Sequence, residues 1–216
     1  MVMAEATNHY FKHLGVSDGL SQVCIPSIYQ DELGAVWLGT TEGLNRYNGK
    51  DVRVFQPSES NHGLTNNEIN ELCGDKNGRM YIRSGNDLIK LDIYTEQFTC
   101  LRQKGVYGLF CKKDTLWVSC ADGIYYYTGQ GTELTFFARV QKGFVGRALY
   151  VDRETVWVVT RKYLVAISRE DPLRQEILLT LDKGNCILGD SSGNIWVGAW
   201  NGLYRVSPDR ETTAYV

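Results

Sequence analysis

The chain has 216 residues, of which 43% are hydrophobic and 22% charged, and its 23 Lys and Arg nearly balance its 25 Asp and Glu. This composition is typical of a globular protein, and a net charge of −2 argues against nucleic acid as a partner. No apolar run reaches the roughly 20 residues that cross a bilayer. Residues 1–7 lack the parts of a signal peptide, which suits a cytoplasmic protein and equally an exported one whose leader is not included.

A repeat of about 40 residues runs along the chain. Its two clearest copies, residues 28–47 (IYQDELGAVWLGTTEGLNRY) and 187–206 (ILGDSSGNIWVGAWNGLYRV), align without a gap. Three weaker copies lie between them, at residues 72–91, 109–127 and 149–167. One aromatic residue per copy marks the period, with separations of 44, 36, 40 and 39 positions: Trp37, Tyr81, Trp117, Trp157 and Trp196. This period is that of a β-propeller blade.

The first copy predicts the four strands of one blade in order. Residues 25–30 are expected to form the innermost strand, and residues 35–39, 44–47 and 52–55 the second, third and fourth. Residues 31–34 (DELG) predict a tight turn, because Asp accepts backbone hydrogen bonds and Gly adopts a positive φ. No segment has the apolar period of a helix, so almost no helix is expected.

The aromatic residue and the glycine of the second strand are predicted to act in packing. Sheets stacked face to face need bulk between them, and a side chain such as Trp37 supplies it. The glycine two residues later, Gly39 or Gly198, is expected to let the chain turn where neighbouring blades crowd together. Both roles are structural and involve no chemistry.

The fold class expected is all-β: a β-propeller of four-stranded antiparallel blades, about five of which are present. A lead-in at residues 1–23 would supply a closing outer strand at residues 10–14. The five blades are expected at residues 24–67, 68–104, 105–143, 144–184 and 185–216. The last has material for a fourth strand at residues 212–216, and whether it is complete is left open. Part of a larger propeller is favoured over a closed ring of five, although propellers have four to eight blades.

The six cysteines have no CxxC or other metal-ligand spacing: Cys24, Cys73, Cys100, Cys111, Cys120 and Cys186. Most are expected to be buried free thiols that pack as small hydrophobic side chains, while one or two disulfides remain an alternative. The three histidines, His9, His13 and His62, also lack metal-ligand spacing and are interpreted as solvated loop residues. The sequence therefore predicts no metal, no cofactor and no catalytic residue.

The stretch from Asp31 to Gly49 reads D-x-x-G-x-φ-W-φ-G-T-x-x-G-L-x-R-Y-x-G, and this pattern resembles the two-component-regulator propeller repeat. The lead-in segments 10–14 and 18–21 also look like the start of such a domain. The middle copies depart from the pattern, since Arg83-Ser84 and Ser119-Cys120 stand in place of Gly-Thr.

This resemblance implies a periplasmic sensor domain of a hybrid two-component system from the Bacteroidetes. In that family two seven-bladed propellers precede a β-sandwich, a membrane helix and a histidine kinase, and oligosaccharides are the ligands. The expected function is therefore carbohydrate sensing in the periplasm, with the export signal absent from this chain. The implied partners are the remaining blades, the kinase portion and a second copy in a homodimer.

Two other functions are kept as alternatives. A stand-alone propeller scaffold for protein interactions, located in the cytoplasm, would have the same fold. Streptogramin lyases have a similar repeat, but they use a His near a metal-binding Glu, and no His lies within a blade core here. The enzyme is therefore the weakest of the three hypotheses, and the chain is expected not to be an enzyme.

A ligand is expected at the loops where the turns between second and third strands meet the connections between blades. Planar donors and exposed aromatic rings suit sugar hydroxyls and ring faces, which favours Arg161 and Trp200. The full set of candidate ligand-binding residues is Arg161, Trp200, Asn201, Arg83 and Asn66. Trp200 could instead plug the central channel of the propeller.

Overall fold

The computed structural model describes residues 13–57, 63–102, 104–129 and 131–215. Within these ranges the chain forms 20 strands in five separate four-stranded antiparallel sheets. The helical content of the same ranges is two three-residue 3-10 helices, Val16–Asp18 and Gln141–Gly143. The prediction of an all-β propeller with almost no helix is confirmed.

Each sheet consists of four strands in chain order. The first is β1 (Ser27–Gln30), β2 (Val36–Thr40), β3 (Gly43–Tyr47) and β4 (Val52–Phe55). The second is β5 (Ile69–Gly74), β6 (Arg79–Ser84), β7 (Asp87–Asp92) and β8 (Gln97–Arg102). The third is β9 (Val106–Lys112), β10 (Thr115–Cys120), β11 (Gly123–Tyr127) and β12 (Thr135–Ala138). The fourth is β13 (Gly146–Val151), β14 (Thr155–Thr160), β15 (Tyr163–Ser168) and β16 (Gln175–Thr180), and the fifth is β17 (Cys186–Gly189), β18 (Ile195–Ala199), β19 (Gly202–Val206) and β20 (Thr212–Tyr215).

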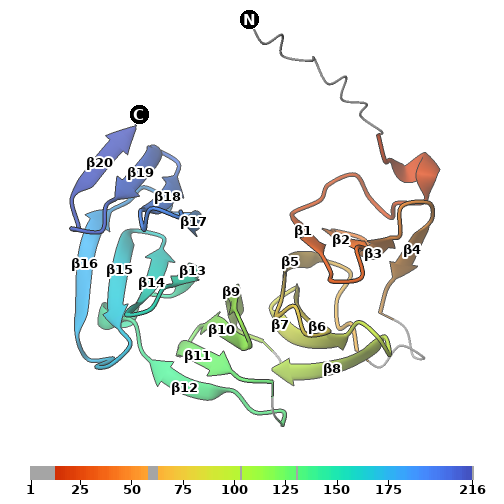
Figure 1. Ribbon diagram of the computed structural model, residues 1–216, viewed down its shortest axis with the longest axis horizontal. Helices are drawn as coiled ribbons and strands as arrows, with labels where there is room; N and C mark the ends of the chain where they lie inside the picture. The colour runs from red at the N-terminus through yellow and green to blue at the C-terminus, as the bar shows by residue number, and fades with distance from the viewer. Residues whose placement is uncertain (1–12, 58–62, 103, 130, 216) are drawn as a thin grey trace, which may run out of the picture.

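The five sheets form an arc, as Figure 1 shows, with the first and fifth sheets at its two ends. The first strands of successive sheets contact one another along the inside of this arc: β1 with β5, β5 with β9, β9 with β13, and β13 with β17. Because neighbouring strands run in opposite directions, the turns and connections of each sheet lie at two opposite edges, which are formed by the ends of the strands. We call the edge with the turns between second and third strands, and with the connections between sheets, the connection edge. The opposite edge, which holds the other two turns of each sheet, is the hairpin edge.

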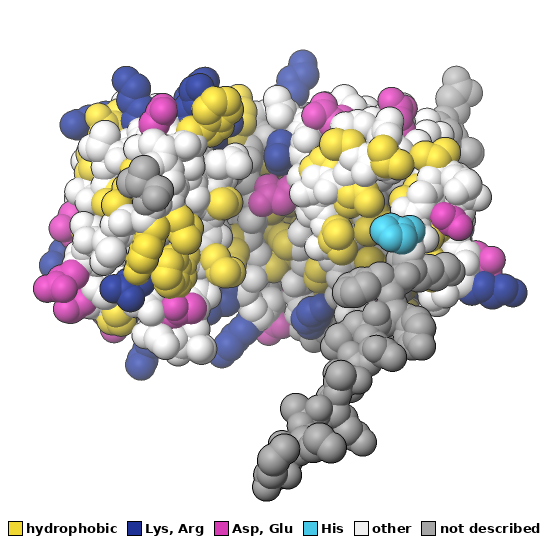
Figure 2. All heavy atoms as spheres, turned by 90° about the horizontal axis from the view of Figure 1, so that it is seen from above, with side chains coloured by type: hydrophobic (Ala, Val, Ile, Leu, Met, Phe, Trp, Pro, Cys, Tyr) yellow, Lys and Arg dark blue, Asp and Glu magenta, His cyan; other side chains and the backbone are white. Residues whose placement is uncertain are grey.

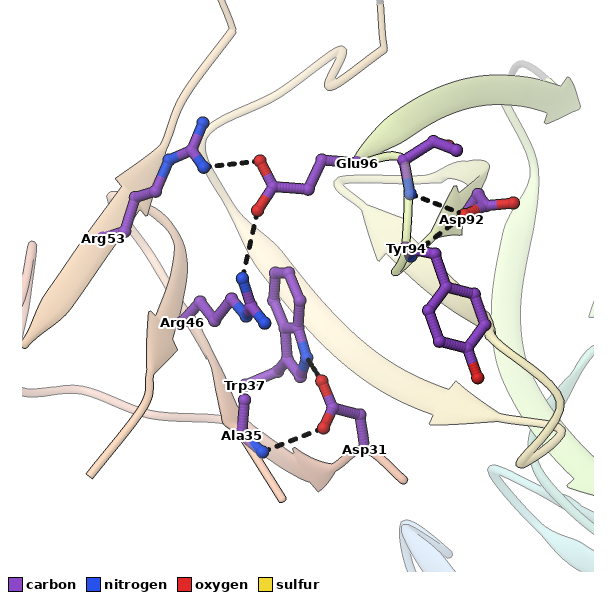
Figure 3. A network of polar contacts seen from close by, with 9 residues as sticks. Asp31, Ala35, Trp37, Arg46, Arg53, Asp92, Tyr94 and Glu96 are labelled. Atoms are coloured by element: carbon purple, nitrogen blue, oxygen red, sulfur yellow. Dashed lines mark hydrogen bonds and ion pairs between the residues drawn. The ribbon is translucent and has the colours of Figure 1, made fainter. Parts of the chain in front are cut away.

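The Asp-x-x-Gly turn is tied to the aromatic residue that follows it (Figure 3). One carboxylate oxygen of Asp31 accepts a hydrogen bond from the backbone amide of Leu33 at 3.0 Å. The same oxygen accepts the Ala35 amide at 2.9 Å. The other accepts the indole N–H of Trp37 at 2.7 Å. The expected turn is present, and its carboxylate also orients the tryptophan. The same Asp-to-indole bond recurs in the fourth and fifth sheets, with Trp157 and Trp196.

The aromatic anchors fill the space between sheets, as the sequence predicted. Trp37 is fully buried and packs in one cluster with Ile69 and Leu72 of the second sheet. Close approach of the same two sheets explains Gly39, because a Cβ there would lie 2.8 Å from the Ile69 Cγ2. Figure 3 shows Glu96, from the turn between β7 and β8, pairing with Arg46 and Arg53 of the first sheet.

Both end sheets have a face that no further sheet covers within the described residues. Figure 2 looks onto the open side of the arc and shows hydrophobic side chains on both ends. Ile28 of the first sheet is 63% exposed and Leu188 of the fifth is 65% exposed. The lead-in covers part of the first face, where Ser21 bonds the side chains of Thr40 and Asn45.

One expectation about the lead-in lies mostly outside the described residues, and one about the cysteines needs correction. The closing strand at residues 10–14 lies largely outside the described residues, and its described part, His13 and Leu14, is not in a strand. One cysteine, Cys120, is buried, while Cys73, Cys100 and Cys111 are half-buried and Cys24 and Cys186 are exposed. Cys186 lies in β17 of the end sheet. Burial depends on a neighbouring sheet, which an apolar stretch in the sequence does not reveal.

The described residues contain neither a membrane-spanning helix nor a cluster of metal-ligating side chains. None of their helices is long and apolar enough to span a membrane. None of their His, Cys, Asp and Glu side chains form a group of three or more that could hold a metal ion.

Candidate functional site

The connection edge of the fourth and fifth sheets brings three of the predicted residues together. The link from β16 to β17 is held between the turns of both sheets: the Gly184 amide donates to the Arg161 carbonyl at 3.1 Å, and the Trp200 amide donates to the Asp182 carbonyl at 2.9 Å. Asn201 follows Trp200 in the same turn, and its side-chain oxygen accepts the Asp182 amide at 3.4 Å. Arg161, Trp200 and Asn201 therefore belong to one continuous run of hydrogen-bonded loops.

Trp200 presents an open ring at this edge. Its side chain is 76% exposed, and the Lys183 ammonium lies 3.9 Å from the ring centroid. An exposed indole beside a cation and an amide can stack on a sugar ring and bond its hydroxyls. The sequence analysis missed Lys183. Lys183 could have been found from its place in the short link between two blades, which lies beside the turn that carries Trp200.

The other two predicted residues lie on the second sheet and are engaged in its own structure. The Asn66 side-chain oxygen accepts the Glu68 amide at 2.9 Å, and the Asn66 backbone bonds the Ser84 hydroxyl. Arg83 is half-buried, pairs with Glu71 at 3.4 Å and donates to the Gly85 carbonyl. Figure 1 shows the third and fourth sheets between the second and the fifth sheet along the arc. The five candidates therefore form two separate groups.

Glu71 is the second residue that the sequence analysis missed. It lies in β5 on the inside of the arc, and its carboxylate also accepts the Leu109 amide of β9 at 3.1 Å. Burial raises the pKa of the Glu71 carboxyl to about 7, while Arg83 and the Leu109 amide oppose the increase. The sequence signal for Glu71 was a charged residue on a predicted inner strand. The equivalent position in the third sheet is Gly108, which has no side chain.

The Glu71 carboxyl predicts a stability change near neutral pH. Because its folded-state pKa lies above the ordinary value of 4.5, its contribution to stability is present at low pH and is lost as the pH rises through about 7. Urea unfolding between pH 4.5 and 8 should therefore show a smaller decline in Glu71→Gln than in the wild type. The exposed Glu68→Gln is the matched control and should keep the wild-type decline. Equal declines in all three proteins would contradict the assignment.

Two charged cavities lie at the hairpin edge, opposite the predicted site. One, of about 660 Å³, lies between the fourth and fifth sheets, and its lining includes Arg153, Arg169 and Arg210. The other, of about 520 Å³, lies between the third and fourth sheets, over Trp117. Two of their arginines are already engaged, since Arg210 pairs with Glu176 and Arg169 donates to two backbone carbonyls.

Comparison with known proteins finds one family model and one curated relative that match part of the chain. Residues 19–42 match the family model described as the two-component regulator propeller. Histidine kinase P4 of Formosa agariphila is 38% identical over 53 residues, which cover 24% of this chain and 4% of that protein. The chain therefore spans a small part of this curated relative.

Solved structures share the fold. The extracellular domain of the hybrid two-component system BT3049 from B. thetaiotaomicron superimposes with a TM-score of 0.82 at 22% identity, covering 94% of this chain and 31% of that one. Streptogramin B lyase matches less well, with a TM-score of 0.70 at 16% identity over 91% of this chain and 70% of that one. The chain is a β-propeller domain in which residues 19–42 match the two-component regulator propeller repeat.

Proposed function

We propose that the chain is part of a periplasmic sensor module of a hybrid two-component histidine kinase, and that it binds an oligosaccharide at the connection edge. The single observation that carries the ligand site is the exposed Trp200 ring with Lys183 over it and Asn201 beside it. The likeness to extracellular sensor domains supports the location and the module. The partners are further blades, a kinase portion and a second copy of the protein.

The link between β16 and β17 explains how binding could affect the rest of the module. It contacts the turns of both the fourth and fifth sheets through backbone hydrogen bonds. A ligand on Trp200 and Arg161 would therefore touch two sheets and change the free energy of their relative placement. A sensor needs such a differential contact, because a ligand shifts only those equilibria whose states it binds unequally.

Calorimetric titration with a panel of plant and host oligosaccharides tests the site. Trp200→Ala and Arg161→Ala are each expected to raise the Kd of the bound oligosaccharide about tenfold, which corresponds to about 1.4 kcal/mol. The loss follows from removing a stacking surface in one variant and a planar donor in the other. Tyr94→Ala removes another exposed aromatic ring, in the turn between β7 and β8 at the hairpin edge, and is the matched control.

Three outcomes separate the alternatives. Unchanged affinity in both Trp200→Ala and Arg161→Ala would contradict the proposed site. Loss of affinity in Arg169→Ala or Arg210→Ala instead would place the ligand in the hairpin-edge cavities. Failure of every oligosaccharide to bind, together with capture of a protein partner, would favour the scaffold.

A further inference from the structure

The contact between the second and third sheets differs from those on either side of it. In each sheet one inner-strand residue lies directly opposite the aromatic anchor of the second strand. This residue is aromatic in the first, third and fourth sheets: Tyr29, Phe110 and Tyr150. In the second sheet the same position is Cys73, opposite Tyr81. A small side chain thus replaces a large ring at one of the four sheet contacts.

The partner of this position in the next sheet also changes. The Tyr29 and Tyr150 rings lie against glycines of the following sheet, Gly74 and Gly189, where a Cβ would overlap the ring. The equivalent of Gly74 in the third sheet is Cys111, because each lies one residue beyond the residue opposite the anchor. At this contact a pair of cysteines therefore occupies the place of a tyrosine ring on a glycine.

The two sulfur atoms are already close. Cys73 Sγ and Cys111 Sγ lie 2.6 Å apart, and a disulfide bond measures about 2.0 Å. The strands around them are held together by the bond from the Leu109 amide of β9 to the Glu71 carboxylate of β5. We propose that Cys73 and Cys111 form a disulfide that links the second and third sheets when the protein folds in an oxidising compartment.

The bond forms by thiol–disulfide exchange with an oxidised dithiol protein or oxidised glutathione. One cysteine loses its proton, and its thiolate attacks the oxidant's disulfide, which releases one oxidant thiolate. The second cysteine, also deprotonated, then attacks the mixed disulfide and releases the other oxidant thiolate. Cys73 and Cys111 together lose two protons and two electrons, and the oxidant leaves as two thiols.

Burial favours closure during folding and persistence afterwards. Burial, together with the neighbouring Cys111, raises the pKa of the Cys73 thiol in the folded chain. In the reduced folded chain little Cys73 thiolate then forms, so oxidation is slow. Once the disulfide has formed, its reduction is slow because the reductant has poor access to the bond and a high-pKa thiol leaves slowly. The link joins residues 38 positions apart, and a loop of that length should raise the unfolding midpoint by about 10 °C.

Peptide mapping of the chain exported to a bacterial periplasm tests the proposal. Under non-reducing conditions we expect one linked peptide that contains Cys73 and Cys111 and is two hydrogen atoms lighter than the reduced pair. The other four cysteines should react with an alkylating agent in denaturant. Six reactive thiols, or a link between any other pair, would overturn the proposal.

Thermal unfolding of the wild type with and without reductant provides a second readout, and variants serve as its controls. Reductant present throughout refolding should lower the wild-type midpoint by about 10 °C, and an unchanged midpoint would contradict the link. Cys73→Ser, Cys111→Ser and the double variant should share this lower midpoint with or without reductant. Cys24→Ser, which removes an exposed thiol, is the control and should retain the wild-type response to reductant. Neither readout involves ligand binding, so its outcome is independent of the proposed sensor function.

Discussion

Replacing Trp37 with alanine is expected to lower the free energy of unfolding by about 3–5 kcal/mol. The side chain is fully buried between the first and second sheets, so its removal leaves a cavity at their contact. It also leaves one oxygen of the buried Asp31 carboxylate without its 2.7 Å indole partner. Urea unfolding followed by circular dichroism measures the loss.

Trp200→Ala is the matched control for this prediction. The same type of side chain is removed, but from a position where it is 76% exposed. Its ring contacts the ammonium group of one residue, Lys183. Its loss should cost less than about 1 kcal/mol. Equal losses in the two variants would show that the aromatic anchors do not support the stacking of the sheets.

Gly108→Ala is expected to destabilise the chain by about 2–3 kcal/mol, because it forces backbone apart. A Cβ at Gly108 in β9 would lie 2.6 Å from the Arg147 carbonyl oxygen in β13. A backbone atom cannot rotate away as a side chain can, so the third and fourth sheets would have to separate. Thermal unfolding of the variant measures the change.

Gly15→Ala provides the control for added bulk at a glycine. A Cβ there meets no atom closer than 3.8 Å, so its stability should stay within about 0.5 kcal/mol of wild type. If Gly108→Ala were equally neutral, the inner strands would not be packed at the distance described.

The fold was predictable because its signals are local. The 40-residue period, the Asp-x-x-Gly turn and the aromatic residue after it lie within a few residues of one another, and each has a direct structural cause. The bond from Asp31 to the Trp37 indole was not predicted, because period and propensity do not show where a side chain points. The exposure of Cys186 was missed because it depends on the absence of a covering sheet.

The candidate site was predictable only in part. The turn position of Trp200 indicated an exposed ring, and the structure places it with Arg161 and Asn201. Arg83 was expected at the same site, but Glu71, twelve residues earlier, engages it on another sheet. Contacts between sheets, including the hairpin-edge cavities and the Cys73–Cys111 pair, join residues distant in sequence and have no local pattern.

Hydrogen–deuterium exchange with and without a saturating oligosaccharide from the titration panel tests the central claim most directly. The account predicts protection of the backbone amides in residues 160–163, 181–185 and 199–202, where the loops of the fourth and fifth sheets meet. Protection confined to the hairpin-edge turns at residues 112–115 and 168–174, or no protection by any oligosaccharide in the panel, would contradict it.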